Sequence, residues 1–247
     1  MATAPDPSTL YPDVAAKGSL AAALQAVVAE QGFSFPVIVS ESDLLRLAAV
    51  PSATPHRETL IVTGWHFERR WSVGGSGKGK LLIYGETEDL NEVVRAAQAW
   101  REGVPLPEIR KAAPFVELTG RYETPDDSPA HVVASEWQYM LKDAQDSNWP
   151  EYLALIEAAH AEPKLRQLYP YTSHWSLRFS TTTAYPFSPD FVCLVASQGG
   201  TYSVRAHWGG PVLAEVATAK EAVSMAVRRL PADLGPAVAG PYERQNH

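Results

Sequence analysis

Apolar residues recur every three to four positions in several separate parts of this chain. The clearest case is Ser19 to Glu30, where Leu20, Leu24 and Val28 fall on one stripe and Gly32 marks the end. The other segments with this spacing are residues 88–101, 131–144, 149–161 and 218–230. A stripe of this width buries one side of a helix and leaves the other side in water, so all of these segments are predicted to be amphipathic helices.

Alternation of apolar and polar residues marks strands between these helices. It is longest over Leu60 to Val73, which predicts a single strand with Ile61 and Trp71 on one face and Val62 on the other. Gly199-Gly200 predicts a tight turn between two later strands. The shorter segments with strand character are residues 35–39, 80–84, 173–182, 190–197 and 201–208, and residues 40–49 are predicted to form a short helix.

Each group of strand segments is followed by an amphipathic helix, and short turns between the strands predict antiparallel pairing. The sequence therefore predicts an α+β protein with two related halves, each an antiparallel sheet with helices packed on one face. Similar helix starts near Thr87 and Thr218 leave a distant duplication open, although other sheet-and-helix sandwiches share this order. The predicted divisions are a flexible leader (1–17), an N-terminal half (18–115), a linker (116–130), a C-terminal half (131–231) and a tail (232–247).

Composition and charge narrow the classes of partner. The 247 residues carry a net charge of −7, and nucleic acid requires a basic surface, so no nucleic-acid partner is expected. The sequence has no run of about 18 apolar residues and no secretory signal, so no membrane partner is expected and a cytoplasmic location is predicted. Cys193 is the only cysteine, which excludes an intramolecular disulfide.

Three familiar kinds of chemistry find little support in the motifs. The Gly-rich run Gly74 to Lys80 matches the first part of a phosphate-binding loop, but Leu81 replaces the required Ser or Thr. The run also joins two strands, so a flexible hairpin turn is predicted. No histidine or cysteine pair has metal-ligand spacing, so neither a metal nor another cofactor is expected. Cys193 lies in an apolar strand where thiols are usually inert, although a nucleophilic role stays open.

The richest group of polar side chains lies in the C-terminal half. Alternation along the strands at 173–182 and 201–208 puts the indoles and aliphatic side chains on one face. Tyr169 and Tyr171 are predicted to lie at the rim. The polar side chains predicted on the opposite face are His174, Ser176, Arg178, Ser203, Arg205 and His207. This face is read as a candidate site; the alternatives are a solvated sheet face and a face packed against the N-terminal half.

Several short motifs resemble a known family. These motifs are Trp137-Gln138, Leu168-Tyr169-Pro170, Thr172 to Trp175, Gly200 to Val204, Thr218 with Glu221-Ala222, Leu230-Pro231, and, near the N-terminus, Leu10 to Val14 and Leu20 to Gly32. Together they resemble an uncharacterised actinobacterial family, a domain of unknown function whose members are labelled as natural-product biosynthesis proteins. The resemblance implies a role in a biosynthetic cluster, namely the maturation of a ribosomally made peptide. It transfers no catalytic residue.

Within that implied role, the hypothesis for the polar face is a metal-free cyclase that closes thioether rings of the lanthionine type. A peptide cysteine would add to a dehydrated serine or threonine, which requires a base, a cation near the enolate oxygen and a proton donor. The assigned roles are His174 and His207 as base and acid, Arg178 and Arg205 as cations, Tyr171 as a proton donor, and Tyr169, Ser176 and Ser203 as substrate-binding residues.

Two other classes of function stay open. A non-catalytic protein could bind a leader peptide, act as a scaffold or confer immunity, and a small-molecule enzyme could hold its substrate between the two halves. The expected partner is a precursor peptide or a partner tailoring enzyme. The sequence makes no prediction of the number of subunits.

Overall fold

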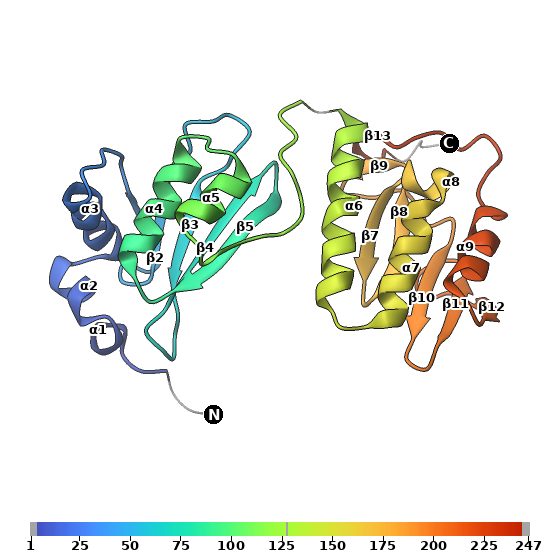
Figure 1. Ribbon diagram of the computed structural model, residues 1–247, viewed down its shortest axis with the longest axis horizontal. Coiled ribbons are helices and arrows are strands. Elements are labelled where there is room, and N and C mark those ends of the chain that lie inside the picture. Colours follow the sequence, from blue (N-terminus) through green and yellow to red (C-terminus); the bar gives the residue numbers. More distant parts are fainter. Residues whose placement is uncertain (1–3, 127, 244–247) are drawn as a thin grey trace. The chain divides into compact units, whose positions relative to one another are not determined.

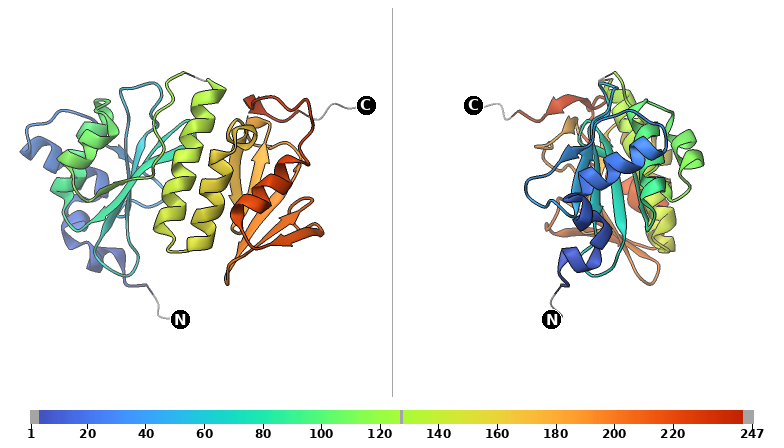
Figure 2. Two further views of the ribbon diagram at one scale, coloured as in Figure 1. Left: turned by 45° about the vertical axis from the view of Figure 1, so that its right-hand side comes forward. Right: turned by 90° about the vertical axis from the view of Figure 1, so that its left-hand side faces the viewer.

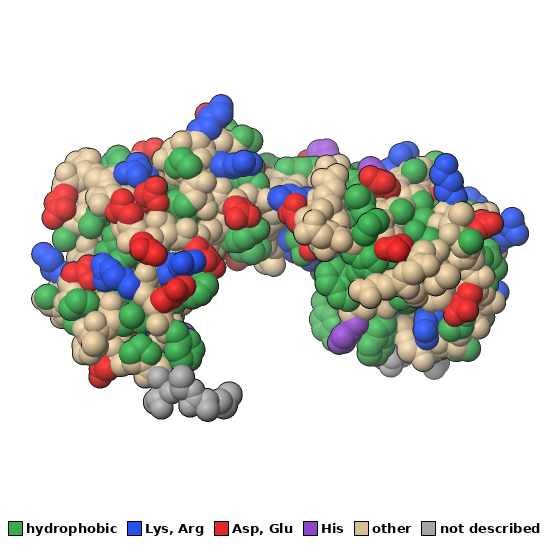
Figure 3. Space-filling view, turned by 60° about the horizontal axis from the view of Figure 1, so that its bottom comes forward, with side chains coloured by type: hydrophobic (Ala, Val, Ile, Leu, Met, Phe, Trp, Pro, Cys, Tyr) green, Lys and Arg blue, Asp and Glu red, His purple; other side chains and the backbone are tan. Residues whose placement is uncertain are grey.

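The computed structural model describes residues 4–126 and 128–243, and the chain divides into two compact units (Figure 1). The first unit ends at Glu123 and the second begins at Thr124. Each unit has its own hydrophobic core and its own antiparallel sheet, with helices on one face. The α+β class with two sheet-bearing regions is therefore confirmed. On the face shown in Figure 3, acidic and basic side chains are interspersed over each unit.

The first unit contains a six-stranded sheet in which every strand pairs with its neighbour in sequence. Its strands are β1 (Ile38–Val39), β2 (Leu47–Val50), β3 (Leu60–Gly64), β4 (Trp71–Gly77), β5 (Lys80–Thr87) and β6 (Val116–Leu118). Its helices are α1 (Pro7–Leu10), α2 (Pro12–Lys17), α3 (Leu20–Glu30), α4 (Leu90–Arg101) and α5 (Leu106–Ala112). All adjacent strands are antiparallel, including β5 and β6, which are joined by the segment that contains α4 and α5.

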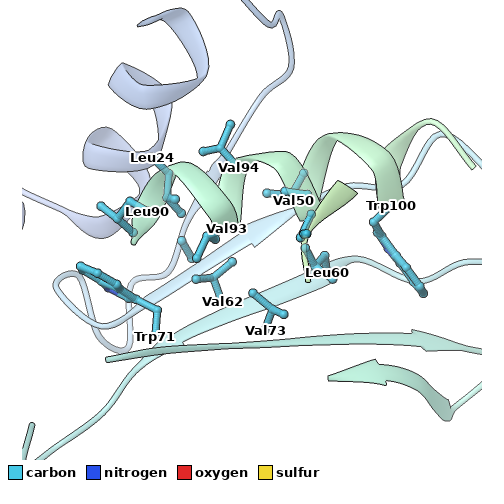
Figure 4. Close-up of a cluster of buried hydrophobic side chains, with 14 of the residues drawn as sticks. Leu24, Val50, Leu60, Val62, Trp71, Val73, Leu90, Val93, Val94 and Trp100 are labelled. Carbon is cyan, nitrogen blue, oxygen red and sulfur yellow. The ribbon is translucent and has the colours of Figure 1, made fainter. Parts of the chain in front are cut away.

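The core of the first unit lies between α4 and the sheet. Figure 4 shows side chains of α4, among them Val93, pointing toward residues of β3 and β4 such as Val62 and Val73. Those three side chains are at most 3% exposed. The helical stripe meets every second residue of each strand, and each fully buried aliphatic side chain stabilises the fold by about 1.5–3 kcal/mol. Trp71 and Trp100, both fully buried, belong to the same cluster.

Three predictions for the first unit are wrong. The predicted strand from Leu60 to Val73 is a hairpin, with β3 and β4 joined by residues 65–70, and its Ile61 points outward while Val62 is buried. The segment 40–49 forms no helix and contributes to β2 instead. Of the predicted flexible leader, residues 7–17 form α1 and α2, because Tyr11 is fully buried in the core.

The glycine-rich run is mostly strand. Gly74 to Gly77 belong to β4, and only Lys78 and Gly79 form the turn to β5, with φ of 50° and 74°. The run thus joins two strands, which agrees with the argument against a phosphate-binding loop. Gly75 lies beneath α4, where an added Cβ would stand 2.9 Å from the ring of Trp100.

The second unit has a five-stranded antiparallel sheet in the order β12-β11-β10-β8-β7. Its strands are β7 (Tyr169–Ser173), β8 (Ser176–Ser180), β10 (Cys193–Ser197), β11 (Thr201–Arg205) and β12 (Val212–Val216), and a separate parallel pair consists of β9 (Thr182–Ala184) and β13 (Val238–Pro241). Its helices are α6 (Pro129–Asp146), α7 (Pro150–Ala161), α8 (Pro163–Arg166) and α9 (Ala219–Val227). Figures 1 and 2 show α6 and α7 side by side on one face of this sheet.

The helices of the second unit begin in different ways. Thr218 and Glu221 form a reciprocal capping box at the start of α9. At the start of α7, Trp149 takes the capping position and makes no side-chain cap. Part of the predicted tail forms β13, and its residues 244–247 lie outside the described residues.

The boundary between the units falls inside the residues predicted as a linker, although β6 and the start of α6 take up part of that segment. In the part of the chain that the structure describes, no helix has both the length and the apolar character needed to cross a membrane.

Candidate functional site

The helix-free face of the second sheet carries one row of functional side chains. Tyr171 on β7 pairs with Arg178 on β8, and Cys193 on β10 pairs with Arg205 on β11. The pairing of Leu194 with Leu177 places Cys193 beside Arg178, so the four residues run across the sheet in register. Their neighbours in the chain point into the core on the opposite side, which is the alternation expected from the sequence.

Asp190 organises this row. Its carboxylate accepts hydrogen bonds from Arg178 Nε at 2.9 and 3.1 Å, from the Tyr171 hydroxyl at 3.1 Å and from the Trp208 backbone N–H at 2.8 Å. The Asp190 side chain is 4% exposed and that of Arg178 is 22% exposed. A buried carboxylate with three charge-assisted or neutral donors is fully satisfied, so the position of Arg178 is fixed by the surrounding structure.

The guanidinium group of Arg178 has a free edge. Its carbon lies 4.8 Å from the centre of the Tyr171 ring and 6.0 Å from that of Trp208. Only Nε contacts Asp190; among the described residues, neither terminal nitrogen of Arg178 has a hydrogen-bond partner. This pair of N–H groups has the geometry that binds a carboxylate through two parallel hydrogen bonds.

A pocket of about 520 Å³ lies against Arg178. Arg178 and Tyr171 form part of its lining, and Tyr185, Phe187 and Tyr242 supply aromatic walls. The Phe187 ring centre is 4.3 Å from that of Tyr171 and 6.1 Å from that of Tyr185. The pocket therefore combines aromatic walls with one cation, a composition typical of small-ligand sites.

Tyr171 cannot act readily as an acid in this arrangement. Burial raises the pKa of its phenol above the usual 10.0, and the charge of Asp190 raises it further. Its proton is also engaged in the hydrogen bond to Asp190. The predicted role of Tyr171 as a proton donor is therefore disfavoured, and its observed role is to support Arg178.

The two predicted catalytic histidines do not lie on strands. His174 and Trp175 form the turn between β7 and β8, with φ of 50° and 62°, so the strand predicted at 173–182 starts only after this turn, at Ser176. β11 ends at Arg205, which leaves His207 in the turn before β12. Both side chains are exposed, and no hydrogen bond or ring contact joins the two imidazoles within the described residues.

Trp208 contacts both His174 and His207. Its ring stacks on that of His174 with centres 5.9 Å apart, whereas the sequence placed the indoles on the opposite face from the histidines. The Nδ1 of His207 donates to the Trp208 carbonyl at 3.0 Å. Trp175 does lie on the helical side, against the rings of Trp149 and Tyr152 at 5.8 and 5.2 Å.

The residues predicted to bind substrate are covered. Tyr169, Ser176 and Ser203 are at most 8% exposed, and the Tyr169 ring stacks on Phe187 at 5.4 Å. Arg205 is half-buried and donates to the Gly210 carbonyl at 3.3 Å. Cys193 is fully buried and burial raises the pKa of its thiol, which disfavours the nucleophilic role.

Sequence reasoning missed the segment that completes the pocket. Residues 185–190 read Tyr-Pro-Phe-Ser-Pro-Asp, and they supply both the aromatic wall and Asp190. Two features of the sequence could have indicated this segment. Its two prolines disfavour regular secondary structure, and its two aromatic residues are unusual for a loop that is fully exposed to water.

A second buried charge cluster, in the first unit, was also missed. Arg57 has a side chain that is 1% exposed and pairs with Glu123 at 2.6 and 3.0 Å. It also donates to the carbonyls of Trp100 and Val104, while His56 Nε2 lies 2.9 Å from the same carboxylate. With every polar group partnered by protein, this cluster is structural, and it fixes the last residue of the unit.

In the described ranges, no group of three or more histidine, cysteine or acidic side chains has the arrangement of a metal site. Residues 131–241 match the model of a family of unknown function, DUF6193. No curated protein matches the chain, and no solved structure matches it. The matched region contains the whole row from Tyr171 to Arg205.

Proposed function

We propose that the second unit is a binding module for a molecule that carries a carboxylate next to an aromatic or apolar group. The observation that carries the proposal is the free edge of Arg178 in a pocket with aromatic walls. Guanidinium groups bind carboxylates in a bidentate manner, and the partly buried setting reduces competition from water.

Asp190 prepares Arg178 for this task. It engages Nε only, so the side chain loses little conformational entropy when a ligand binds at the other edge. The Asp190 carboxylate also accepts hydrogen bonds from the Tyr171 hydroxyl and the Trp208 backbone N–H, which partly balance its negative charge. The neighbouring rings of Phe187 and Tyr185 provide apolar surface for the part of the ligand beside its carboxylate.

The test compares N-acetyl-phenylalanine with N-acetyl-phenylalanine amide by isothermal titration calorimetry on the full chain. The acid should bind, and the amide should bind at least tenfold more weakly because it cannot form the charge-assisted pair. Arg178→Gln should reduce affinity for the acid by a similar factor. Arg229→Gln, which removes an exposed arginine after α9, is the matched control and should have no effect. Equal binding of acid and amide would contradict the proposal.

Thioether ring closure on a ribosomally made precursor peptide is the second candidate. One observation favours it: Trp208 contacts both His174 and Arg178, which brings a solvent-exposed base to the neighbourhood of a free cation. His174 would take the thiol proton, the thiolate would add to the β-carbon of the dehydrated residue, and Arg178 would stabilise the enolate. The protonated His174 would return the proton to the α-carbon, so no cofactor is consumed.

This second candidate requires its own experiment, because ring closure does not change the mass of the dehydrated peptide. A purified dehydrated peptide is incubated with the protein, and the remaining free thiols are alkylated and counted by mass spectrometry. Loss of thiols that requires both His174 and Arg178 would support catalysis. Tight carboxylate binding with no loss of thiols would support the binding role and contradict ring closure.

A further inference from the structure

A second pocket, of about 590 Å³, lies on the helical side of the second unit. Val133 and Trp137 of α6 and His160 near the end of α7 form part of its lining, and residues 236–237 of the C-terminal segment form another part. It shares no lining residue with the pocket at Arg178. Volumes of this size accommodate small organic molecules.

Two hydrogen bonds hold the C-terminal wall of this pocket in place. The backbone N–H of Ala237 donates to the Gln167 carbonyl at 3.0 Å, and the Gln167 side-chain amide donates to the Leu234 carbonyl at 3.4 Å. These two bonds hold the segment against the loop that follows α8. The cavity is therefore a fixed feature of the unit.

His160 is a half-buried polar group in this largely apolar space, whose other polar lining residues are Ser128, Gln138, Arg166 and Gln167. Its ring centre is 5.3 Å from that of Trp137, whose indole N–H donates to the Arg166 carbonyl at 3.0 Å. Within the described residues, neither ring nitrogen of His160 has a hydrogen-bond partner. A half-buried imidazole without a protein partner is unusual, since polar groups in such positions are normally satisfied.

We infer that this pocket binds an uncharged, largely apolar small molecule with one hydroxyl or carbonyl group that hydrogen-bonds to His160. Most of the lining is apolar and disfavours a ligand charge, which would lose its hydration there, and Arg166, the charged residue of the lining, is itself exposed to water. Burial lowers the pKa of His160 below its usual 6.5, and the charge of Arg166 acts in the same direction. At neutral pH the imidazole is therefore uncharged and offers one donor and one acceptor.

The probe for this site is 2-naphthol, with naphthalene and naphthalene-2-sulfonate as comparisons, titrated into the full chain by calorimetry. We expect 2-naphthol to bind, naphthalene to bind about tenfold more weakly and the sulfonate not to bind. His160→Phe keeps a ring against Trp137 but removes both ring nitrogens. It should lower the affinity for 2-naphthol about tenfold and leave that for naphthalene unchanged.

Two further variants locate the binding. Ala134→Trp fills the mouth of the pocket and should abolish binding, whereas Gln145→Trp, at an exposed position of the same helix, should not alter it. Arg178→Gln should leave naphthol affinity unchanged, which separates this site from the carboxylate pocket. The inference is overturned if 2-naphthol does not bind, if His160→Phe binds it as well as the unmodified chain, or if the sulfonate binds best.

Discussion

Each unit contains an arginine whose position is fixed by a carboxylate, at a point that no sequence motif marks. Asp190 satisfies three donors around the candidate site, and Glu123 satisfies Arg57 at the end of the first unit. In each case a carboxylate fixes the position of an arginine: the Asp190 side chain is 4% exposed, and the Arg57 side chain, paired with Glu123, is 1% exposed. Pairs of this kind are costly to break, because the remaining charge stays buried without a partner.

The replacement Glu123→Gln tests the structural cluster. We expect the free energy of unfolding of the first unit to fall by about 2–3 kcal/mol at neutral pH, measured by urea denaturation, because Arg57 keeps its charge and loses its partner. Glu30→Gln, at an exposed position, should change it by less than about 0.5 kcal/mol. A loss no larger than that of the control would show that Arg57 does not depend on Glu123.

The same variant gives a pH dependence with a defined sign. Burial disfavours the charged form of Glu123, but hydrogen bonds from Arg57 and the charge of Arg57 outweigh it, so the pKa lies below its usual 4.5. The stabilisation is therefore complete above pH 4.5 and is lost as the pH falls through the lower folded value. The stability difference between the unmodified chain and Glu123→Gln should shrink as the pH falls through that acidic range.

At the scale of elements, the close packing of α4 on the sheet depends on a residue without a side chain. Gly75→Ala should reduce the free energy of unfolding by about 1–3 kcal/mol, because its Cβ would stand 2.8 Å from Ile83 and 2.9 Å from Trp100. Gly74→Ala is the matched control on the other face of the same strand, where the nearest atom, in Leu81, is 3.6 Å away. Equal denaturation midpoints for the two variants would contradict this account.

Two wrong predictions in the first unit have one cause. The hydroxyl of Tyr11 lies 2.9–3.2 Å from the carbonyls of Trp65, Glu68 and Arg70, in the turn between β3 and β4. The segment predicted as a flexible leader therefore packs against the turn inside the segment predicted as a continuous strand. Alternation continues through that turn, and a contact across more than fifty residues leaves no local signal.

Tyr11→Phe isolates that contact. The change removes the hydroxyl and keeps the ring, so we expect a loss of about 1–2 kcal/mol in the free energy of unfolding. Tyr84→Phe removes the hydroxyl of a more exposed tyrosine on β5, whose hydrogen bond to Glu117 lies at the surface, and serves as the control with a smaller expected loss. Similar values for both variants would show that the Tyr11 hydroxyl does not stabilise the turn.

At the scale of the whole molecule, two separate cores divide the chain near residue 123. No strand of either sheet comes from the other unit. The two units of a protein with this organisation should fold as separate fragments. Fragments 1–123 and 124–247 should each unfold cooperatively when followed by circular dichroism, and the second should bind N-acetyl-phenylalanine as the full chain does. An unfolded second fragment would contradict the division into independent units.

The sequence by itself determined the amphipathic helices α3, α4, α6, α7 and α9, most strand positions, the α+β class and the alternation that brings Arg178 and Arg205 to one face of a sheet. These features depend on local periodicity, which each segment carries alone. Only the tertiary structure decided which of those side chains line a pocket. Asp190 and the aromatic wall come from an irregular segment, the two histidines fall in separate turns, and Trp208 lies against His174. Those outcomes depend on contacts between residues far apart in the chain, and no periodic pattern encodes them.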